Sequence, residues 1–179
     1  MKVLGAIIAG GKSSRMGQDK AFIEWHGKTL LAHVIDRLST QTDHLIINSN
    51  RDLAGFGLVV VPDKIETGTP IAGLHAVLTY ASDHGFDAVL TSPCDTPLLP
   101  LDLCARLSGQ TAAIAASVGQ AHYLAGFWPI ECVKLLNGLI RVKDFAAKAK
   151  ARQVEWLVKD YDPFININTP QDVLDLPGD

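Results

Sequence analysis

Long apolar stretches are missing from this chain of 179 residues, in which no run approaches the ~20 residues that a membrane-spanning helix needs. An excess of basic residues is also missing, because 16 lysines and arginines stand against 19 aspartates and glutamates and give a net charge of −3. General electrostatic attraction to nucleic acid or to an anionic lipid surface is therefore excluded as the leading function. An anionic ligand has to be held by local groups or by a metal.

Cysteine and histidine motifs are lacking as well. The three cysteines, at 94, 104 and 132, form no C-x-x-C pair, and the six histidines form no H-E-x-x-H pattern. Neither a disulfide framework nor a structural zinc site is indicated. The apolar N-terminus is too short for a signal sequence. We expect a soluble cytoplasmic protein with reduced thiols and with no membrane or nucleic-acid partner.

Short β-branched runs alternate with amphipathic stretches along most of the chain, which is the pattern of an α/β domain. The expected fold has three layers and a mostly parallel sheet with a Rossmann-like nucleotide-binding topology. Thr169-Pro170-Gln171-Asp172 predicts the start of a last short helix through about Leu176. Strands are expected at residues 3–8, 45–48, 58–61, 88–91, 112–116, 123–127 and 154–158, and amphipathic helices at 30–38, 71–81 and 131–137.

No internal repeat, low-complexity segment or long linker divides the chain, so a single domain over residues 1–179 is expected. The strand–helix alternation loosens only near residues 119–122. In open α/β sheets, ligands bind beyond the carboxyl ends of the strands. Polar residues or glycines end or follow the first four expected strands, at Gly10-Gly11, Asn48, Asp63 and Asp95. This convergence indicates a ligand site at that edge of the sheet.

The segment 8–20, IAGGKSSRMGQDK, follows the first expected strand and contains three glycines, two serines and three cations. Glycines allow the backbone amides to approach a phosphate closely. Arg15 and Lys20 carry the charge that a triphosphate needs. The P-loop pattern fails because Ala6 stands where that motif requires its first glycine, which weakens a P-loop kinase as an alternative function. The pattern favours a phosphate-binding loop, and a solvated surface loop is the alternative.

The same loop, Ala9-Gly10-Gly11-x-Ser13-x-Arg15-Met16-Gly17-x-Asp19-Lys20, resembles the signature loop of the nucleotidyltransferases that build the molybdenum cofactor, in particular the molybdenum cofactor guanylyltransferase family. The resemblance continues through NSNR at 48–51, PD at 62–63, PIAGL at 70–74, PCDTP at 93–97 and NINTP at 166–170. It implies a nucleotidyltransferase-type fold and an Mg²⁺-dependent enzyme that transfers GMP from GTP to the terminal phosphate of molybdopterin and releases pyrophosphate. The nucleotide half is expected over residues 1–110 and the second-substrate half over 111–179.

Asp95 illustrates how the residues and the resemblance combine. A carboxylate in a rigid turn between Pro93 and Pro97 suits Mg²⁺, which prefers carboxylates together with substrate phosphates. An aspartate that caps a turn is the alternative. The resemblance assigns Asp95 to the metal; Lys20, Arg15 and Asp95 to catalysis; and Ile8, Ala9, Gly10, Gly11, Lys20, Asn48, Asp63 and Asp95 to the nucleotide.

The second substrate has a less specific set of candidates: Gly73, Arg141, Asn166 and Asn168. Asn166 and Asn168 flank Ile167 in an expected strand, so their amides would share one face and could meet a pterin ring; capping of the next helix is the alternative. Arg141 matches a family arginine that meets the second substrate's phosphate, although its cation-rich surroundings are also typical of a solvated helix face.

Three features bear on specificity. The resemblance implies guanine, because CTP-using relatives have alanine where this loop has Gly10. Thr69 replaces the glycine that the family usually has before Pro70, and His122-Tyr123 departs from the usual His-Pro pair, so no role is assigned to His122. A nucleotidyltransferase that uses CTP or a sugar or alcohol phosphate, and a non-catalytic nucleotide-binding regulatory module, are the alternatives. Cofactor-delivery proteins and apo-molybdoenzymes are the protein partners that the resemblance allows.

Overall fold

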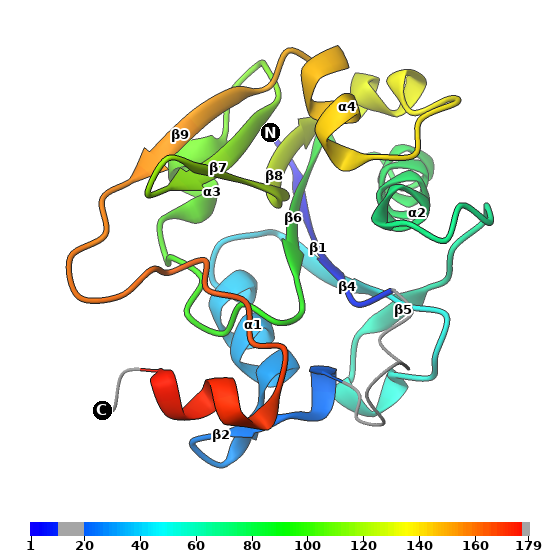
Figure 1. Ribbon diagram of the computed structural model, residues 1–179. Coiled ribbons are helices and arrows are strands. Elements are labelled where there is room, and N and C mark those ends of the chain that lie inside the picture. Colours follow the sequence, from blue (N-terminus) through cyan, green and yellow to red (C-terminus); the bar gives the residue numbers. More distant parts are fainter. Residues whose placement is uncertain (11–19, 177–179) are drawn as a thin grey trace.

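The computed structural model describes residues 1–10 and 20–176. Its centre is a seven-stranded sheet in the order β5-β4-β1-β6-β8-β7-β9 (Figure 1). Among these strands β8 alone runs against its neighbours β6 and β7, whereas the other neighbouring strands pair parallel. The mostly parallel sheet is confirmed. The strands are β1 (Val3–Ile8), β4 (His44–Asn48), β5 (Val59–Val61), β6 (Ala88–Pro93), β7 (Ala113–Ser117), β8 (Gln120–Pro129) and β9 (Arg152–Trp156).

Helices cover both faces of the sheet and give the expected three layers. The α-helices are α1 (Leu30–Ser39), α2 (Pro70–Asp83), α3 (Leu103–Leu107) and α4 (Val142–Lys148). Side chains of α1 and α3 pack in one cluster with Ile7 of β1, and those of α2 and α4 pack in another with Ala6 and Ile8. All six residues of β1 are buried, which explains its uninterrupted apolar sequence. No helix in the described ranges is long and apolar enough to span a bilayer.

Several expected elements differ in type or were not predicted. The stretch expected as an amphipathic α-helix at 131–137 is the 3-10 helix η4 (Ile130–Leu135), which begins directly after Pro129. The last helix is also 3-10, η5 (Pro170–Asp175), with the predicted threonine cap at Thr169. The sequence pattern did not predict α3, α4, or the 3-10 helices η2 (Lys20–Phe22) and η3 (Ala54–Phe56), because three to seven residues do not establish a helical period.

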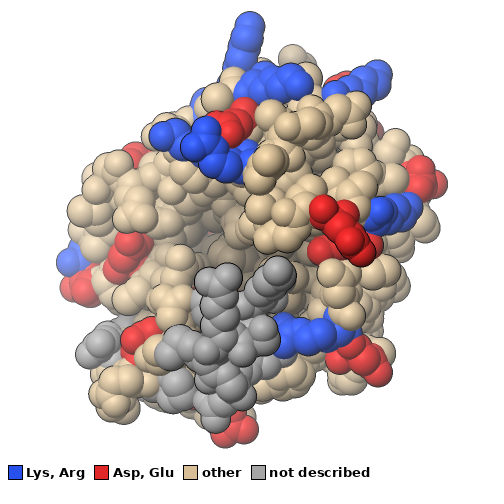
Figure 2. Space-filling model, turned by 45° about the vertical axis from the view of Figure 1, so that its right-hand side comes forward, with Lys and Arg blue, Asp and Glu red and all other residues tan. Residues whose placement is uncertain are grey.

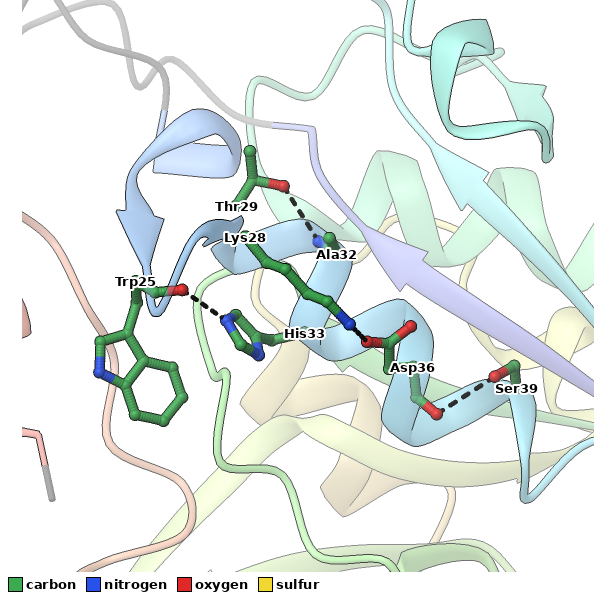
Figure 3. Close-up of polar contacts among 7 residues, drawn as sticks. All are labelled: Trp25, Lys28, Thr29, Ala32, His33, Asp36 and Ser39. Carbon is green, nitrogen blue, oxygen red and sulfur yellow. Dashed lines mark hydrogen bonds and ion pairs between the residues drawn. The ribbon is translucent and has the colours of Figure 1, made fainter. Parts of the chain in front are cut away.

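A small hairpin leads from the glycine-rich segment into α1 (Figure 3). Its strands, β2 (Glu24–Trp25) and β3 (Lys28–Thr29), are joined by His26 and Gly27, which both have positive φ angles, as a two-residue hairpin turn requires. Thr29 then caps α1 by accepting a hydrogen bond from Ala32 N, and His33 of α1 contacts the Trp25 carbonyl at 2.8 Å. The start of α1 is therefore fixed to the hairpin from two directions.

The packing around Trp128 gives a test of the core. Trp128 is completely buried, and a Cβ at Gly126 would lie 2.6 Å from its Cζ2 atom. Since Trp128 Nε1 also donates to Thr91 Oγ1 at 2.9 Å, the indole cannot withdraw without losing a buried hydrogen bond. We expect Gly126→Ala to lower the free energy of unfolding by about 1–3 kcal/mol and the melting temperature by several degrees.

Gly55→Ala is the matched control for this substitution, because a Cβ at Gly55 meets nothing within 4 Å. Thermal unfolding followed by circular dichroism measures both variants. Equal melting temperatures for the two alanine variants would contradict the packing described around the indole.

Candidate active site

A cavity of about 690 Å³ opens at the carboxyl edge of the sheet. It lies where β1, β4 and β5 end and where α2 begins, and Figure 2 shows a hollow near the centre of one face of the molecule. The backbone joins these strand ends, because Ala9 N donates to the Asn48 carbonyl at 2.9 Å and Ser49 N donates to the Val61 carbonyl at 3.1 Å. The cavity is lined by Ile8, Ala9, Gly10, Asn48, Ser49, Asn50, Arg51, Asp63, Ile65, Glu66, Thr67, Gly68, Thr69, Pro70 and Gly73.

The side-chain amide of Asn48 is the most constrained polar group in the cavity. Its Nδ2 atom donates to the Val61 carbonyl at 3.0 Å and to Asp63 Oδ1 at 2.9 Å. Both neighbours are acceptors, so the amide has to turn its nitrogen toward them. Asn48 Oδ1 is consequently left buried, and none of the residues that the structure describes gives it a hydrogen-bond partner. An unpaired buried acceptor at a cavity wall is suited to receive a donor from a ligand.

Two glycines give this acceptor its space. A Cβ at Gly73 would lie 2.2 Å from Asn48 Oδ1, and a Cβ at Gly10 would lie 3.3 Å from the same atom and 3.8 Å from Asp63 Oδ2. The structure thus brings together Gly10, Asn48 and Asp63, which the sequence assigned to the nucleotide. It places Gly73, assigned there to the second substrate, in the same cavity.

Asp63 is held by a second asparagine that sequence reasoning did not single out. Asn50 Nδ2 donates to Asp63 Oδ2 at 2.9 Å, and Asp63 N donates to Asn50 Oδ1 at 2.8 Å. This reciprocal pair fixes the carboxylate beside Asn48. Among the described residues the ionisable groups on the cavity lining are Asp63, Glu66 and Arg51, so this described part of the lining is acidic rather than basic. Such a lining suits a neutral donor-bearing ring better than a phosphate chain.

Thr69 shows how the chain adjusts to the absence of the family's glycine before Pro70. The positive φ angle falls on Gly68, at 65°, whereas Thr69 has an extended backbone with φ −130° that any residue adopts. The Thr69 hydroxyl donates to the Ile140 carbonyl at 2.7 Å. Threonine therefore fits at this position and ties the loop before α2 to the chain that precedes α4.

Asp95 lies beside the end of β1, although it is not among the residues that line the cavity. Ile8 of β1 is paired with Pro93 of β6, so Gly10 and Asp95 each follow that pair by two residues on strands about 4.8 Å apart. The Asp95 carbonyl accepts a hydrogen bond from Ile167 N at 2.9 Å. Because β1 and β6 are parallel neighbours, Asp95 follows β6 at the same edge of the sheet at which Gly10 follows β1.

The most cationic part of the expected site falls largely outside the described residues. Gly11 and Arg15 lie outside them, and so does the side chain of Lys20. The neighbouring Ala21 is completely buried in the cluster that includes Ile7 and Ala9. The backbone of η2 is thereby anchored in the core on the α1 side of the sheet.

Asn166 and Asn168 are not in a strand, which corrects that expectation: residues 165–168 have no regular structure. The alternation still holds, because both asparagines are exposed and Ile167 between them is completely buried. Asp172 accepts from the backbone amides of Asn168 and Thr169, at 2.8 and 3.0 Å, so capping of η5 is one role of this segment. Capping geometry, rather than strand pairing, sets the backbone here.

Arg141 is exposed and forms a two-point ion pair with Asp144, with Nε–Oδ2 and Nη2–Oδ1 distances of 2.7 and 3.0 Å. The hydrogen bonds and charge of Asp144 raise the pKa of Arg141. Figure 2 shows lysine and arginine side chains gathered on the upper part of one face, at the level of α4. The neighbouring Ile140, whose carbonyl accepts from Thr69 Oγ1, brings Arg141 close to the loop before α2.

A mostly parallel sheet with a cavity at its carboxyl edge, followed in sequence by a glycine-rich segment, is typical of a nucleotide-binding α/β protein. The family model for the MobA-like NTP transferase domain matches residues 5–155. The chain belongs to this family of nucleotidyltransferases. Solved structures agree on the fold: molybdopterin-guanine dinucleotide biosynthesis protein A from Archaeoglobus fulgidus has a TM-score of 0.72 at 19% identity, covering 96% of this chain and 95% of that one. A nucleotidyl transferase from Methanothermobacter thermautotroptrophicus has a TM-score of 0.74 at 18% identity, covering 97% and 95%.

Curated relatives match over nearly the whole chain. A molybdenum cofactor guanylyltransferase of Rhodopseudomonas palustris (strain BisB5) is 41% identical over 186 residues, which cover 93% of this chain and 89% of the relative. A protein of the same name from Cereibacter sphaeroides (strain ATCC 17023) is 38% identical over 185 residues, covering 97% and 94%. The family resemblance that the loop motif indicated is confirmed.

Proposed function

We propose that this chain transfers GMP from GTP to the terminal phosphate of molybdopterin, giving a guanine dinucleotide and pyrophosphate. The names of the relatives support this reaction. The observation that carries it is the buried, unpartnered Oδ1 of Asn48 beside the Asp63 carboxylate in the carboxyl-edge cavity. Cofactor-delivery proteins and apo-molybdoenzymes of the cytoplasm are the protein partners that fit this reaction.

The arrangement of acceptors favours guanine. The guanine edge carries a ring N–H beside an amino group, so that two donors can meet Asn48 Oδ1 and the Asp63 carboxylate. Cytosine and adenine each present a single amino group and would leave one of these acceptors unpaired. An unpaired buried acceptor costs about 1–3 kcal/mol, or roughly 5- to 150-fold in affinity. Gly10 keeps a side chain away from the same acceptor.

The triphosphate belongs outside this acidic cavity, over the segment that follows Gly10. Backbone amides of Gly10 and Gly11 would hold the β- and γ-phosphates, and Arg15 and Lys20 would neutralise their charge. Among the described residues no group of three or more His, Cys, Asp or Glu could hold a metal. Mg²⁺ needs no such group, because one or two carboxylates together with substrate phosphates complete its coordination. Asp95 would supply such a carboxylate. When bound, Mg²⁺ supplies positive charge to the phosphate oxygens.

The chemistry needs positioning and charge compensation rather than a general base. An oxygen of the acceptor phosphate attacks the α-phosphorus of GTP, the bond from that phosphorus to the bridging oxygen breaks, and pyrophosphate leaves. A phosphate monoester is already nucleophilic near neutral pH, so the obstacle is repulsion between anions. Arg15 and Lys20 reduce that repulsion. Asn166 and Asn168 would meet the pterin, and Arg141 would have to leave Asp144 to meet the acceptor phosphate.

The direct test is to incubate the protein with molybdopterin, Mg²⁺ and either GTP, CTP or ATP, and to measure pyrophosphate and the dinucleotide product. At nucleotide concentrations below saturation GTP is expected to support both roughly 5- to 150-fold better than CTP or ATP, because of the two acceptors at Asn48 and Asp63. Faster product formation with CTP would contradict the base assignment. GTP-dependent thermal stabilisation without pyrophosphate release would instead identify a non-catalytic nucleotide-binding module, and transfer to a sugar phosphate would identify a different acceptor.

A further inference from the structure

A second polar cluster lies at the carboxyl edge, around His122. Ser117 ends β7 and is completely buried, and His122 lies just past the turn that leads into β8. Because β7 and β6 both pair antiparallel with β8, the end of β7 and the start of β8 lie at the same edge as the ends of β6 and β1. Asp162 joins the cluster from the chain that follows β9.

The hydrogen bonds in this cluster determine which nitrogen of His122 carries the proton. Ser117 Oγ lies 2.8 Å from Asp162 Oδ1 and 2.6 Å from His122 Nε2. A carboxylate can only accept, so the serine hydroxyl donates to Asp162 and His122 donates its Nε2–H to the serine oxygen. In the neutral ring Nδ1 then carries a lone pair. Burial lowers the pKa of His122 below the ordinary 6.5, and the negative charges of Asp162 and Glu155 oppose that shift only in part.

The His122 ring is held by stacking, and its Nδ1 atom has no hydrogen bond within the described residues. His122 stacks on Phe164 with ring centroids 4.7 Å apart and an interplanar angle of 20°. In the described part of the chain the buried side-chain atoms without a partner are Asn48 Oδ1 and His75 Nδ1. His122 Nδ1 has no hydrogen bond there and is not one of these two, so it is not fully buried. Residues 123–125 form an irregularity in the β7–β8 pairing directly after His122, a feature that often adjoins binding sites.

The same stretch of chain connects this cluster to Asp95. The His122 ring stacks on Phe164, and Ile167, three residues after Phe164, donates its N–H to the Asp95 carbonyl. Three residues reach at most about 11 Å. His122 therefore stands on the rim of the sheet on the far side of Asp95 from the Asn48 cavity.

We propose that His122 binds the acceptor substrate by accepting, at Nδ1, a hydrogen bond from an N–H group of its heteroaromatic ring, which is the pterin if the proposed function holds. A lone pair on a ring that also feels the negative charges of Asp162 and Glu155 suits the donor edge of such a ring and repels a phosphate, which is itself an anionic acceptor. Ser117 and Asp162 act as positioning residues, because they hold His122 in the tautomer that leaves Nδ1 unprotonated.

Two substitutions separate binding from structure. In His122→Gln the longer amide can still donate to Ser117 but offers no acceptor at the Nδ1 position. In His122→Asn the shorter amide keeps an oxygen at that position and loses the contact with Ser117. Titration with 6-hydroxymethylpterin, followed by quenching of its fluorescence, is expected to show roughly tenfold weaker binding to the Gln variant, as for one lost hydrogen bond of ~1.4 kcal/mol, and binding within about threefold of wild type for the Asn variant.

The pH dependence gives a readout that a merely structural role would not move. As the pH falls through the pKa of His122, below 6.5, Nδ1 gains a proton and can no longer accept. Pterin binding to wild type is therefore expected to weaken toward low pH, with no such change in the Gln variant. Equal pterin affinity of wild type and the Gln variant, the same pH profile in both, or no pterin binding by wild type would each overturn the assignment.

Thermal stabilisation by GTP controls for folding in these variants, since His122 lies outside the Asn48 cavity. The proposal rests on the proposed function, yet the two fail in different assays. Pterin binding with the expected pattern but no pyrophosphate release would overturn the reaction and leave His122 as a binding residue. Pyrophosphate release together with pterin binding that is insensitive to His122 would overturn the role of His122 alone.

Discussion

Asp95→Asn is expected to lower kcat for nucleotidyl transfer about 100- to 1000-fold, because a single group that stabilises transition-state charge contributes about 2.7–4 kcal/mol. Asparagine keeps the size of the side chain and removes its charge. The backbone carbonyl that accepts from Ile167 N is unaffected, so the turn after β6 should persist. Steady-state pyrophosphate release with saturating substrates measures the effect, and GTP binding measured without Mg²⁺ should stay within about twofold.

Asp83→Asn is the matched control for that substitution. Asp83 is an exposed carboxylate at the end of α2, whose other end begins at the cavity, so it lies toward the opposite edge of the sheet. The kcat of the Asp83→Asn variant is expected to equal that of wild type. A kcat within threefold of wild type for Asp95→Asn would remove Asp95 from the catalytic machinery.

Gly73→Ala is expected to weaken GTP binding more than tenfold and to lower the free energy of unfolding by about 1–3 kcal/mol. Alanine is favoured over glycine inside a helix by about 1 kcal/mol, so propensity alone predicts the opposite sign for stability. The added Cβ would lie 2.2 Å from Asn48 Oδ1, and the amide would have to leave its bonds to the Val61 carbonyl and to Asp63. Each unpaired buried group costs about 1–3 kcal/mol.

A double-mutant cycle with Asn48→Ala isolates this contact. Once the amide is removed, the remaining close neighbour of the added Cβ is Ile8 Cγ2 at 3.2 Å, a side-chain methyl group that has to shift by only a few tenths of an ångström. In that background Gly73→Ala should stabilise the protein by up to about 1 kcal/mol through helix propensity. Chemical denaturation of the four proteins measures the change of sign. If Gly73→Ala destabilises the protein equally in both backgrounds, the cost comes from elsewhere in α2.

The sequence predicted the sheet and the part of the site that depends on strand ends. Gly10, Asn48 and Asp63 follow different strands, and they meet because parallel strands end at one edge. That rule needs only the order of strands and loops, so it works without a structure. The buried strand β1 was predicted with its observed bounds because an uninterrupted apolar run before a glycine pair leaves little choice.

Contacts that depend on packing between distant segments could not be predicted. Gly73 reaches Asn48 only because α2 crosses over the end of β4, and no local pattern shows which atom a helical glycine will face. The cluster of Ser117, His122 and Asp162 joins three elements, and a lone histidine in a strand carries no periodic signal. The segment with Asn166 and Asn168 alternates like a strand, but the side chain of Asp172 takes up backbone donors there.

The direction of β8 has a consequence beyond this chain. Because β8 runs against β7, the two are joined by a tight tip at Val118 and Gly119, with φ angles of 50° and 71°, instead of by a crossover helix. Exposed tips of this kind accept insertions and deletions without moving the strands beneath them. Insertions or deletions at this tip can therefore change the surface beside His122 while the strands that hold the nucleobase stay unchanged. One ancestral fold can in this way acquire new acceptor substrates for the nucleotidyl group.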